Sequence, residues 1–506
     1  MIERTRRADS PQRMERINTV LDTADGFGGK TIDTLGSYVL LINNITGPGL
    51  VVLPLAYQQS GWIVSSTLLI LLGVVSAVCS DMLVEAMSHV PGNSRFEGRV
   101  EFTYLARRTF SRGGFYTVLC LFFLSLVSGI ISSVVESGQV IDRALLEAGN
   151  SCALELYPDA GFICMNSHED GDEDSIFGSR YVISVGYLVI LTLSIPLGLM
   201  NLDDNIIVQI ISFIGLVIVI IVWTIFFIHH GLDLSICPPV GESTAAMGFL
   251  FFNYSYIITI PSWVNEKRPE VPLRSTIWNT AFVGLVMFAV VGLLGSMGHN
   301  YGAGADLLSY MLKHHIPTYA RVITYFFPMF ALVTSIPVFS IIMRYNLLEN
   351  KICGKFQANF WSVVFPWLLS LFFYGGNTIN YMLNWTGIIT VGPLNFIVPV
   401  LLYLATRQDT PQLPITRRGT EDMKAYTKLA SIPEDKEADG EEIEMVISNT
   451  IGLNRSQSAC TEGYEALPGW SPRAIKYLSW SIIVSAVLLT AYSIASAAAS
   501  DAGVNI

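Results

Sequence analysis

The sequence predicts an all-α membrane protein with about eleven transmembrane helices. Of its 506 residues, 51% are hydrophobic and only 14% are charged, whereas soluble domains carry about 25% charged residues. The apolar residues form continuous blocks, and several blocks approach the roughly 20 residues that a membrane helix needs. A transmembrane β-barrel would instead show segments of about ten residues with alternating polarity. Composition and blocks together favour helices embedded in lipid.

Eleven apolar runs define the expected spans and divide the chain into parts. The runs cover 35–57, 62–88, 114–147, 179–199, 205–228, 246–264, 277–297, 319–343, 358–374, 381–405 and 474–497. The parts are a cytoplasmic N-terminal tail (1–32), a ten-helix core (33–405), a cytoplasmic loop (406–471) and an eleventh helix with a short C-terminal tail (472–506).

The basic residues predict the orientation of this multi-pass chain. Cytoplasmic loops near membrane helices collect Lys and Arg, and a cytoplasmic N-terminus places 26 of the 30 basic residues on that side. With an odd number of spans, Ile506 then lies outside the cell or in an organelle lumen. The sequence leaves open whether the host is the plasma membrane or a vacuolar or lysosomal membrane.

Three cysteines fall on the outer side of this topology. Cys152 and Cys164 lie in one acidic outer loop, where an oxidising compartment favours a disulfide. Cys237 also lies outside and offers a competing partner. The sequence does not decide between the two pairings.

The cytoplasmic loop 406–471 is acidic and rich in Ser, Thr, Gly and Pro. Such a composition buries too little apolar surface to order itself, so it predicts a disordered linker. Phosphorylation, or docking on cytoplasmic partners that the sequence does not identify, is the alternative interpretation.

Other function classes find no support. The chain lacks a His-Glu-x-x-His metal site, a Gly-x-Ser-x-Gly elbow and a phosphate-binding loop, so nothing indicates an enzyme, a metal or an organic cofactor. The formal net charge of −11 argues against nucleic acid as a partner, because binding phosphates requires clustered basic residues. The lipid bilayer is the expected surrounding.

The most informative motif interrupts the first expected helix at Thr46, Gly47, Pro48 and Gly49. Glycine and proline break the helical hydrogen-bond ladder, and unpaired backbone groups are tolerated at membrane depth only inside protein or beside a water-filled cavity. In transporters with broken helices, the free N–H groups of one half-helix face an anionic substrate group. A plain proline kink with close helix packing is the alternative.

A second uncommon stretch opens the sixth expected helix at Asn253, Ser255 and Tyr256. Helices one and six each begin a five-helix set, which is where repeat-built transporters place their broken pair. The sixth helix lacks a glycine cluster, so its unwinding near Asn253 to Ser255 is inferred from this pairing.

Several motifs occur in order between about residues 33 and 405: Gly-Pro-Gly-Leu-Val-Val-Leu-Pro at 47–54, Ile-Pro-Ser-Trp-Val-Asn-Glu-Lys-Arg-Pro at 260–269, Ser-Ile-Pro at 335–337 and Gly-Pro-Leu-Asn-Phe at 392–396. Together they resemble the amino acid/auxin permease family, which is related to neutral amino acid transporters of LeuT-like fold. The resemblance implies two inverted five-helix repeats around a central site, with the eleventh helix packed outside.

The resemblance also implies where an amino acid binds. Its carboxylate is expected at the backbone N–H groups of 46–49, and its ammonium at carbonyls exposed in helices one and six. The implied substrate-binding residues are Thr46, Gly47, Pro48, Gly49, Asn253, Ser255, Tyr256 and, in helix three, Ser132. Small residues such as Ser132 are also common packing positions.

The coupling ion is left open between Na⁺ and H⁺, with sodium slightly favoured. By the resemblance to sodium-coupled relatives, Asn43, Thr334 and Ser335 are the candidate ion ligands. Ser and Thr hydroxyls also bond back to their own helix carbonyls.

A carboxylate buried in the membrane would favour protons instead, because such groups are costly and usually functional. Asp81, Glu85 and Glu136 lie toward helix ends, and each is expected at the membrane interface rather than buried.

The sequence therefore predicts secondary active transport of amino acids, of the neutral class, by alternating access. An ion gradient is the expected energy source because no nucleotide-binding motif is present. The alternative is an amino-acid-sensing receptor of the same fold that signals through its cytoplasmic segments. Which amino acid is carried, and in which direction, is not readable from the residues.

Overall fold

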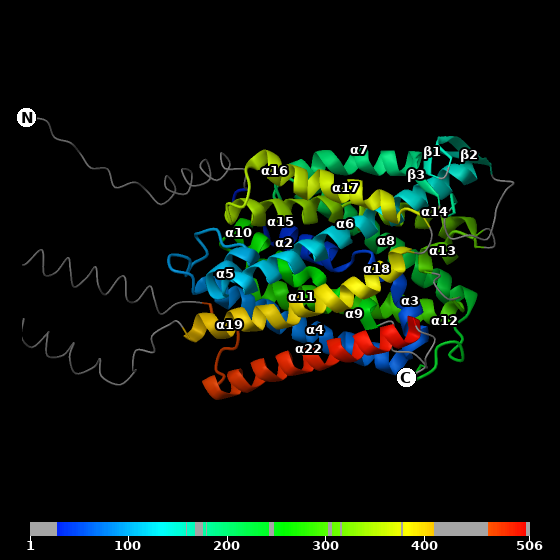
Figure 1. Ribbon diagram of the computed structural model, residues 1–506. Helices are drawn as coiled ribbons and strands as arrows, with labels where there is room; N and C mark the ends of the chain where they lie inside the picture. Colours follow the sequence, from blue (N-terminus) through cyan, green and yellow to red (C-terminus); the bar gives the residue numbers. More distant parts are fainter. Residues whose placement is uncertain are drawn as a thin grey trace, which may run out of the picture.

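The computed structural model describes residues 28–408 and 464–501, apart from 158, 167–175, 179, 242–246, 302–305, 314–315 and 376–377. Figure 1 shows helices packed side by side along one long axis. One end of this bundle carries a small sheet and is called the sheet end. The other end carries the short helix α5 (Phe102–Thr109) and is called the α5 end.

Eight helices in the described residues are long and apolar enough to cross a membrane. Several of them contain π-helical or 3₁₀ turns and so comprise more than one element. They are α4 (Trp62–Ser88), α6 (Arg112–Ala148), α8 (Ile206–His230), α11–η2–α12 (Leu273–Ala289, Val290–Leu294, Gly295–Gly298), α14–η3–α15 (Thr318–Phe327, Pro328–Leu332, Ser335–Glu349), α16–η4–α17–η5 (Lys355–Asn359, Phe360–Val364, Phe365–Ser370, Leu371–Phe373), α18–η6–η7–α19 (Thr378–Thr386, Gly387–Val391, Pro393–Ile397, Val398–Gln408) and α22 (Pro472–Asp501).

The remaining helices are broken or short. Together, α2 (Thr34–Ile45) and α3 (Gly49–Ser60) are long and apolar enough to form one bent membrane span. The shorter pieces are α7 (Val185–Leu199), α9 (Met247–Asn253), η1 (Ser255–Thr259), α10 (Ile260–Glu266) and α13 (Leu307–Met311). The predicted multi-helix membrane fold is thus confirmed, while the count of eleven spans and the inverted repeats stay predictions.

The surface of α8 is that of a helix in lipid. A row of isoleucines along one face is exposed: Ile207, Ile211, Ile214, Ile218, Ile221, Ile225 and Ile228. The opposite face buries its polar and small residues, among them Gln209, Ser212 and Gly215. An exposed apolar stripe of this length would be unfavourable in water but is stable against hydrocarbon.

The sheet end carries three antiparallel strands that the all-α prediction missed. Strand β1 (Asn150–Tyr157) lies between β2 (Gly161–Asn166) and β3 (Tyr181–Ser184). Buried and more exposed residues alternate along the first part of β1, the period-two pattern of a half-buried strand, but the buried positions include Ser151 and Glu155 while Leu154 and Leu156 are exposed, so hydrophobicity did not predict this burial. A disulfide joins Cys152 to Cys164 across β1 and β2, whereas Cys237 is a free, buried thiol.

Candidate functional site

The first helix breaks at the residues that the sequence singled out. Helix α2 ends at Ile45, α3 begins at Gly49, and the two are bent by 49°. Both the N–H and the hydroxyl of Thr46 turn back to the carbonyl of Ile42, each at 2.9 Å. No side chain caps α3, and the first N–H groups of a helix have no partner within it. Of these groups, the N–H of Leu50 donates to the carbonyl of Gly47 at 3.1 Å.

The second break lies in the stretch predicted for helix six. Helix α9 ends at Asn253, the 3₁₀ turn η1 follows from Ser255, and α10 begins at Ile260. Tyr256 is fully buried, whereas Ser255 is half-buried and therefore borders accessible space.

Two asparagines hold the breaks side by side. The amide of Asn253 donates to the carbonyl of Gly49 at 3.2 Å and to that of Phe249 at 2.8 Å. The amide of Asn44 donates to the hydroxyl of Thr259 at 3.4 Å. The structure therefore brings together the two segments that the sequence paired by analogy.

An internal space lies beside Gly47. This glycine is buried, yet a Cβ atom built on it would meet no atom within 4 Å. At Gly49 the same construction places the Cβ only 2.8 Å from Oδ1 of Asn253, an oxygen that is buried and accepts no hydrogen bond. The break thus encloses unfilled space instead of closing on itself.

The charge pattern around this space suits a zwitterion. The start of α3 presents N–H groups and the positive end of a helix dipole, and the end of α2 presents carbonyls and a negative end. A carboxylate is therefore favoured at the start of α3, and an ammonium at the end of α2.

Ser132 is not brought to the breaks by any contact seen in the described residues. Its hydroxyl donates to the carbonyl of Gly129 one turn back on α6, at 3.1 Å, and it is fully buried. The substrate role of Ser132 stays a prediction, as does the alternative of helix packing.

The three predicted ion ligands meet through a residue that the sequence analysis missed. The amide of Asn43 donates to both oxygens of Gln209 on α8, and the amide of Gln209 donates to the carbonyl of Thr334 at 3.0 Å. The hydroxyls of Thr334 and Ser335 donate to carbonyls of their own helical turns. An amide N–H group of Gln209 therefore occupies the carbonyl of Thr334, whereas Oδ1 of Asn43 is buried without a partner in the described residues. The signal for Gln209 was a lone amide within an apolar run.

Asp81 and Glu85 are buried, each only 1% exposed, so the interfacial placement predicted for them is wrong. Both are satisfied by partners from distant segments. Asp81 accepts from the hydroxyl of Tyr464 and from the indole of Trp278. Glu85 accepts from Arg407 at 2.9 Å and from the backbone N–H of Ala466 at 2.6 Å.

These contacts anchor the C-terminal end of the predicted cytoplasmic loop. Arg274 of α11 donates to the carbonyls of Glu465 and Ala466. The stretch from Tyr464 to Ala466 is thus tied to α4 and α11 at the α5 end. Residues 409–463 of the predicted linker lie outside the described residues.

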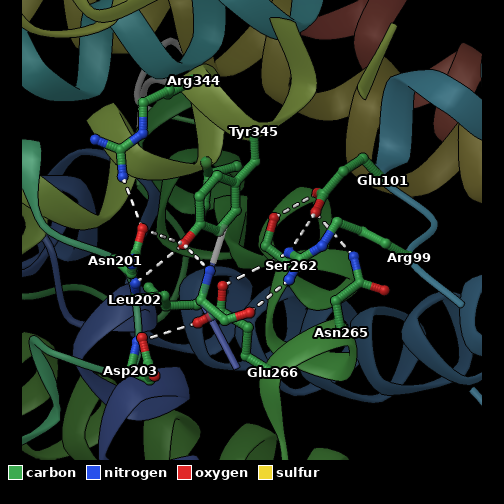
Figure 2. Close-up of polar contacts among 12 residues, drawn as sticks. Arg99, Glu101, Asn201, Leu202, Asp203, Ser262, Asn265, Glu266, Arg344 and Tyr345 are labelled. Atoms are coloured by element: carbon green, nitrogen blue, oxygen red, sulfur yellow. Dashed lines mark hydrogen bonds and ion pairs between the residues drawn. The ribbon is translucent and has the colours of Figure 1, made fainter. Parts of the chain in front are cut away.

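A buried ionic cluster closes the α5 end of the bundle. Figure 2 shows Arg99 between the carboxylates of Glu101 and Glu266, at 3.9 and 3.6 Å. Ser262 and Asn265 of α10 donate to Glu101, at 2.6 and 2.8 Å. We call Arg99, Glu101, Glu266 and Tyr345 the Arg99 cluster.

The first described residues are bound into the Arg99 cluster. Arg99 donates to the carbonyl of Gly28 at 2.7 Å, and the N–H of Gly28 donates to the hydroxyl of Tyr345 on α15. The backbone of Ile32 bonds to Glu266 and Arg268. The cluster therefore joins the chain before α2 to α10 and α15.

Burial governs the acidity of this cluster. Glu266 lies beyond the apolar run 246–264, and desolvation raises its pKa to about 8 against the opposing effect of Arg99. Desolvation also raises the pKa of Glu101, with Arg99 again opposing.

We expect the protein to lose stability as pH rises from about 5 to 8. The folded state keeps a proton on Glu266 that the unfolded state has released above its ordinary pKa of 4.5, so the free energy of unfolding falls with pH, by at most about 1.4 kcal/mol per pH unit. Thermal unfolding in detergent should show this slope, and Glu266→Gln should flatten it. The exposed Glu270→Gln serves as control, and an unchanged slope in Glu266→Gln would refute the assignment.

The fold and the site define a class: multi-pass membrane transporters built with discontinuous helices. Residues 30–424 match the family model of the transmembrane amino acid transporter proteins. The chain belongs to this family. It is therefore an integral membrane protein of amino acid transport and not an enzyme.

Solved structures are similar at low identity. A manganese transporter of Eremococcus coleocola in complex with an aromatic bis-isothiourea substituted compound shares 13% identity at a TM-score of 0.47, covering 91% of this chain and 94% of that one. Two mutants of the same transporter give TM-scores of 0.47 and 0.46, each at 13% identity, with 92% and 94% of the two chains covered. No curated protein sequence matches.

Proposed function

We propose that the protein is a secondary transporter that moves amino acids, of the neutral class, by alternating access. The observation that carries the proposal is the unfilled space beside Gly47, between the uncapped start of α3 and the unwound turn after Asn253. The space offers N–H groups to a carboxylate and carbonyls to an ammonium. The described side chains that join the two breaks, Asn44, Asn253 and Thr259, are uncharged, which favours neutral substrates.

The proposal includes the topology. Ten spans form two inverted halves around the site, and α22 is the eleventh, packed against η6, η7 and α19. The α5 end is cytoplasmic and the sheet end is outside. The disulfide between Cys152 and Cys164 supports this orientation, because disulfides persist in oxidising compartments.

In this topology the Arg99 cluster is the cytoplasmic closure of the transport path. The cluster ties the chain preceding α2 to α10 and α15. Helices α2 and α10 are the half-helices on the α5 side of the two breaks. Opening toward the cytoplasm requires these elements to separate.

The energy source is a cation gradient. Sodium would bind among Asn43, Thr334 and Ser335, after Gln209 withdraws its amide from Thr334. A proton gradient is the alternative energy source. Uptake measured under an imposed sodium gradient and under an imposed proton gradient distinguishes the two.

Uptake by the purified protein in liposomes tests the function. An inward sodium gradient, an inward proton gradient or no gradient is imposed across the vesicle membrane, and labelled neutral amino acids are added outside. We expect gradient-dependent accumulation above that of protein-free vesicles. Neither uptake nor exchange of any amino acid, by protein shown to be folded and inserted, would refute transport.

A second function, amino acid sensing, is favoured by one observation. The end of the long loop is bound to Asp81 and Glu85 of α4, so movement of α4 would reach the loop directly. A sensor would bind an amino acid in a thermal-shift assay yet show no flux in the same vesicles.

A further inference from the structure

Glu136 is a buried carboxyl group that the proposed substrate site does not use. It lies on α6, is 4% exposed, and neither carboxylate oxygen has a hydrogen-bond partner among the described residues. The interfacial placement predicted from sequence is therefore wrong for this residue too. Asp142, farther along α6, shows the contrast: it accepts from the hydroxyl of Tyr374 at 2.6 Å and the N–H of Gly186 at 2.8 Å.

An ionised carboxylate in this position would be strongly disfavoured. Burying an unpaired charge costs several kcal/mol even after the protein relaxes. The charge of Asp306, at the start of α13, acts on Glu136 with the same sign and so adds to this cost. The neutral, protonated form is the one that fits the closed surroundings.

The charged and titratable groups around this part of α6 have other partners. Glu147 of α6 pairs with Arg321 of α14 at 2.7 Å and accepts from Tyr325. Asp306 caps the N–H of Ser309, and Tyr187 of α7 donates to the carbonyl of Trp367. Arg143 of α6 is not a free cation either. A basic side chain that would stabilise an ionised Glu136 is thus not seen among the described residues.

The position of Glu136 links it to the parts that move in alternating access. Ser132 and Ser133 lie one helical turn before it, on the same face of α6. The hydroxyl of Ser133 is 3.2 Å from that of Ser335 at the start of α15. The carboxyl group therefore lies next to the contact between α6 and α15, on its sheet-end side.

We propose that Glu136 is the proton-carrying group of this transporter, so that an amino acid and a proton cross the membrane together. The inference rests on the proposed function and specifies its energy source. The Glu136 carboxylate takes a proton from hydronium on the outer side, which leaves water, and holds it while buried. On the cytoplasmic side its O–H bond breaks and water accepts the proton; no other bond changes.

The arrangement at the predicted sodium ligands supports the choice of protons. The amide of Gln209 already donates to the carbonyl of Thr334, and the two hydroxyls are turned to their own helices. Among these predicted ligands, Oδ1 of Asn43 alone has no partner in the described residues, a single neutral oxygen, whereas both carboxylate oxygens of Glu136 lack one.

The test compares wild type, Glu136→Gln, Glu136→Asp and the exposed-carboxylate control Asp233→Asn in liposomes. Two readouts are taken: uptake driven by an inward proton gradient, and exchange of labelled for unlabelled amino acid with no gradient. We expect Glu136→Gln to lose proton-driven accumulation at least tenfold while keeping exchange. Glu136→Asp should keep reduced proton-driven uptake, and Asp233→Asn should match wild type.

Each other outcome overturns a defined claim. Proton-driven accumulation that survives in Glu136→Gln, or accumulation by wild type under sodium gradients alone, refutes the role of Glu136 and leaves transport standing. No exchange by wild type refutes transport itself. A Glu136→Gln protein that fails to fold also refutes the role, because a neutral amide of the same shape should replace a protonated carboxyl without loss of stability.

Discussion

Replacing Gly47 with valine is expected to abolish amino acid uptake while leaving the protein folded and inserted. The Cβ of a residue at 47 would meet no atom within 4 Å, and the position lies outside both half-helices, so the structure can accept the side chain. The side chain would instead fill the space between the breaks. Each charge-assisted hydrogen bond to the proposed substrate that is lost, at about 1.5–3 kcal/mol, would weaken binding by about tenfold or more.

Two other glycine variants serve as controls for Gly47→Val, one with open space at its Cβ position and one without. Gly113 is exposed in the first turn of α6 with open space around its Cβ position, and Gly113→Val should transport normally. Gly49→Val should reduce the yield of folded protein, because its Cβ would lie 2.8 Å from Oδ1 of Asn253. Normal uptake by Gly47→Val would remove the substrate from the first break.

Removing the charge of Arg99 is expected to destabilise the closed state more than any other single change at the α5 end. Above pH 8, where Glu266 is ionised, Arg99→Gln leaves Glu101 and Glu266 buried without their cation, and breaking a buried ion pair in this way costs about 3–5 kcal/mol. The unfolding temperature in detergent should fall, and the cytoplasmic closure should open more readily.

Rescue distinguishes the ionic role of Arg99 from simple packing. Measured above pH 8, where Glu266 is ionised, Arg99→Gln combined with Glu266→Gln removes both charges and should recover much of the lost stability. The exposed Arg108→Gln is the control for loss of one positive charge. If the double variant is as unstable as Arg99→Gln, the charge of Glu266 is not what Arg99 stabilises.

The two breaks could be predicted, the first from a local cause and the second from its place in the chain. Glycine and proline at 47–49 interrupt the helix wherever the rest of the chain lies, and the break before Ser255 followed from the pairing of the first helices in two sets. The lipid-embedded character followed equally well from apolar run lengths.

Burial of the acidic side chains could not be predicted, because their partners come from remote parts of the chain. Asp81 is covered by Tyr464, 383 residues away, and Glu101 by Ser262 and Asn265. Gln209 similarly joins two segments that share no motif. Position within a single helix suggests only a depth in the membrane, and depth alone does not show what covers a carboxylate.

The two carboxylate oxygens of Glu85 bind both borders of the stretch 409–463. Oε1 pairs with Arg407 before this stretch, and Oε2 accepts from Ala466 after it. The described residues on either side of this stretch, Arg407 and Ala466, are therefore held at the same carboxylate of the bundle. Closure entropy varies slowly with contour length, by about 0.6 kcal/mol per doubling. The folded bundle therefore tolerates large changes in the length of this loop, which makes it a favourable place to insert a reporter domain.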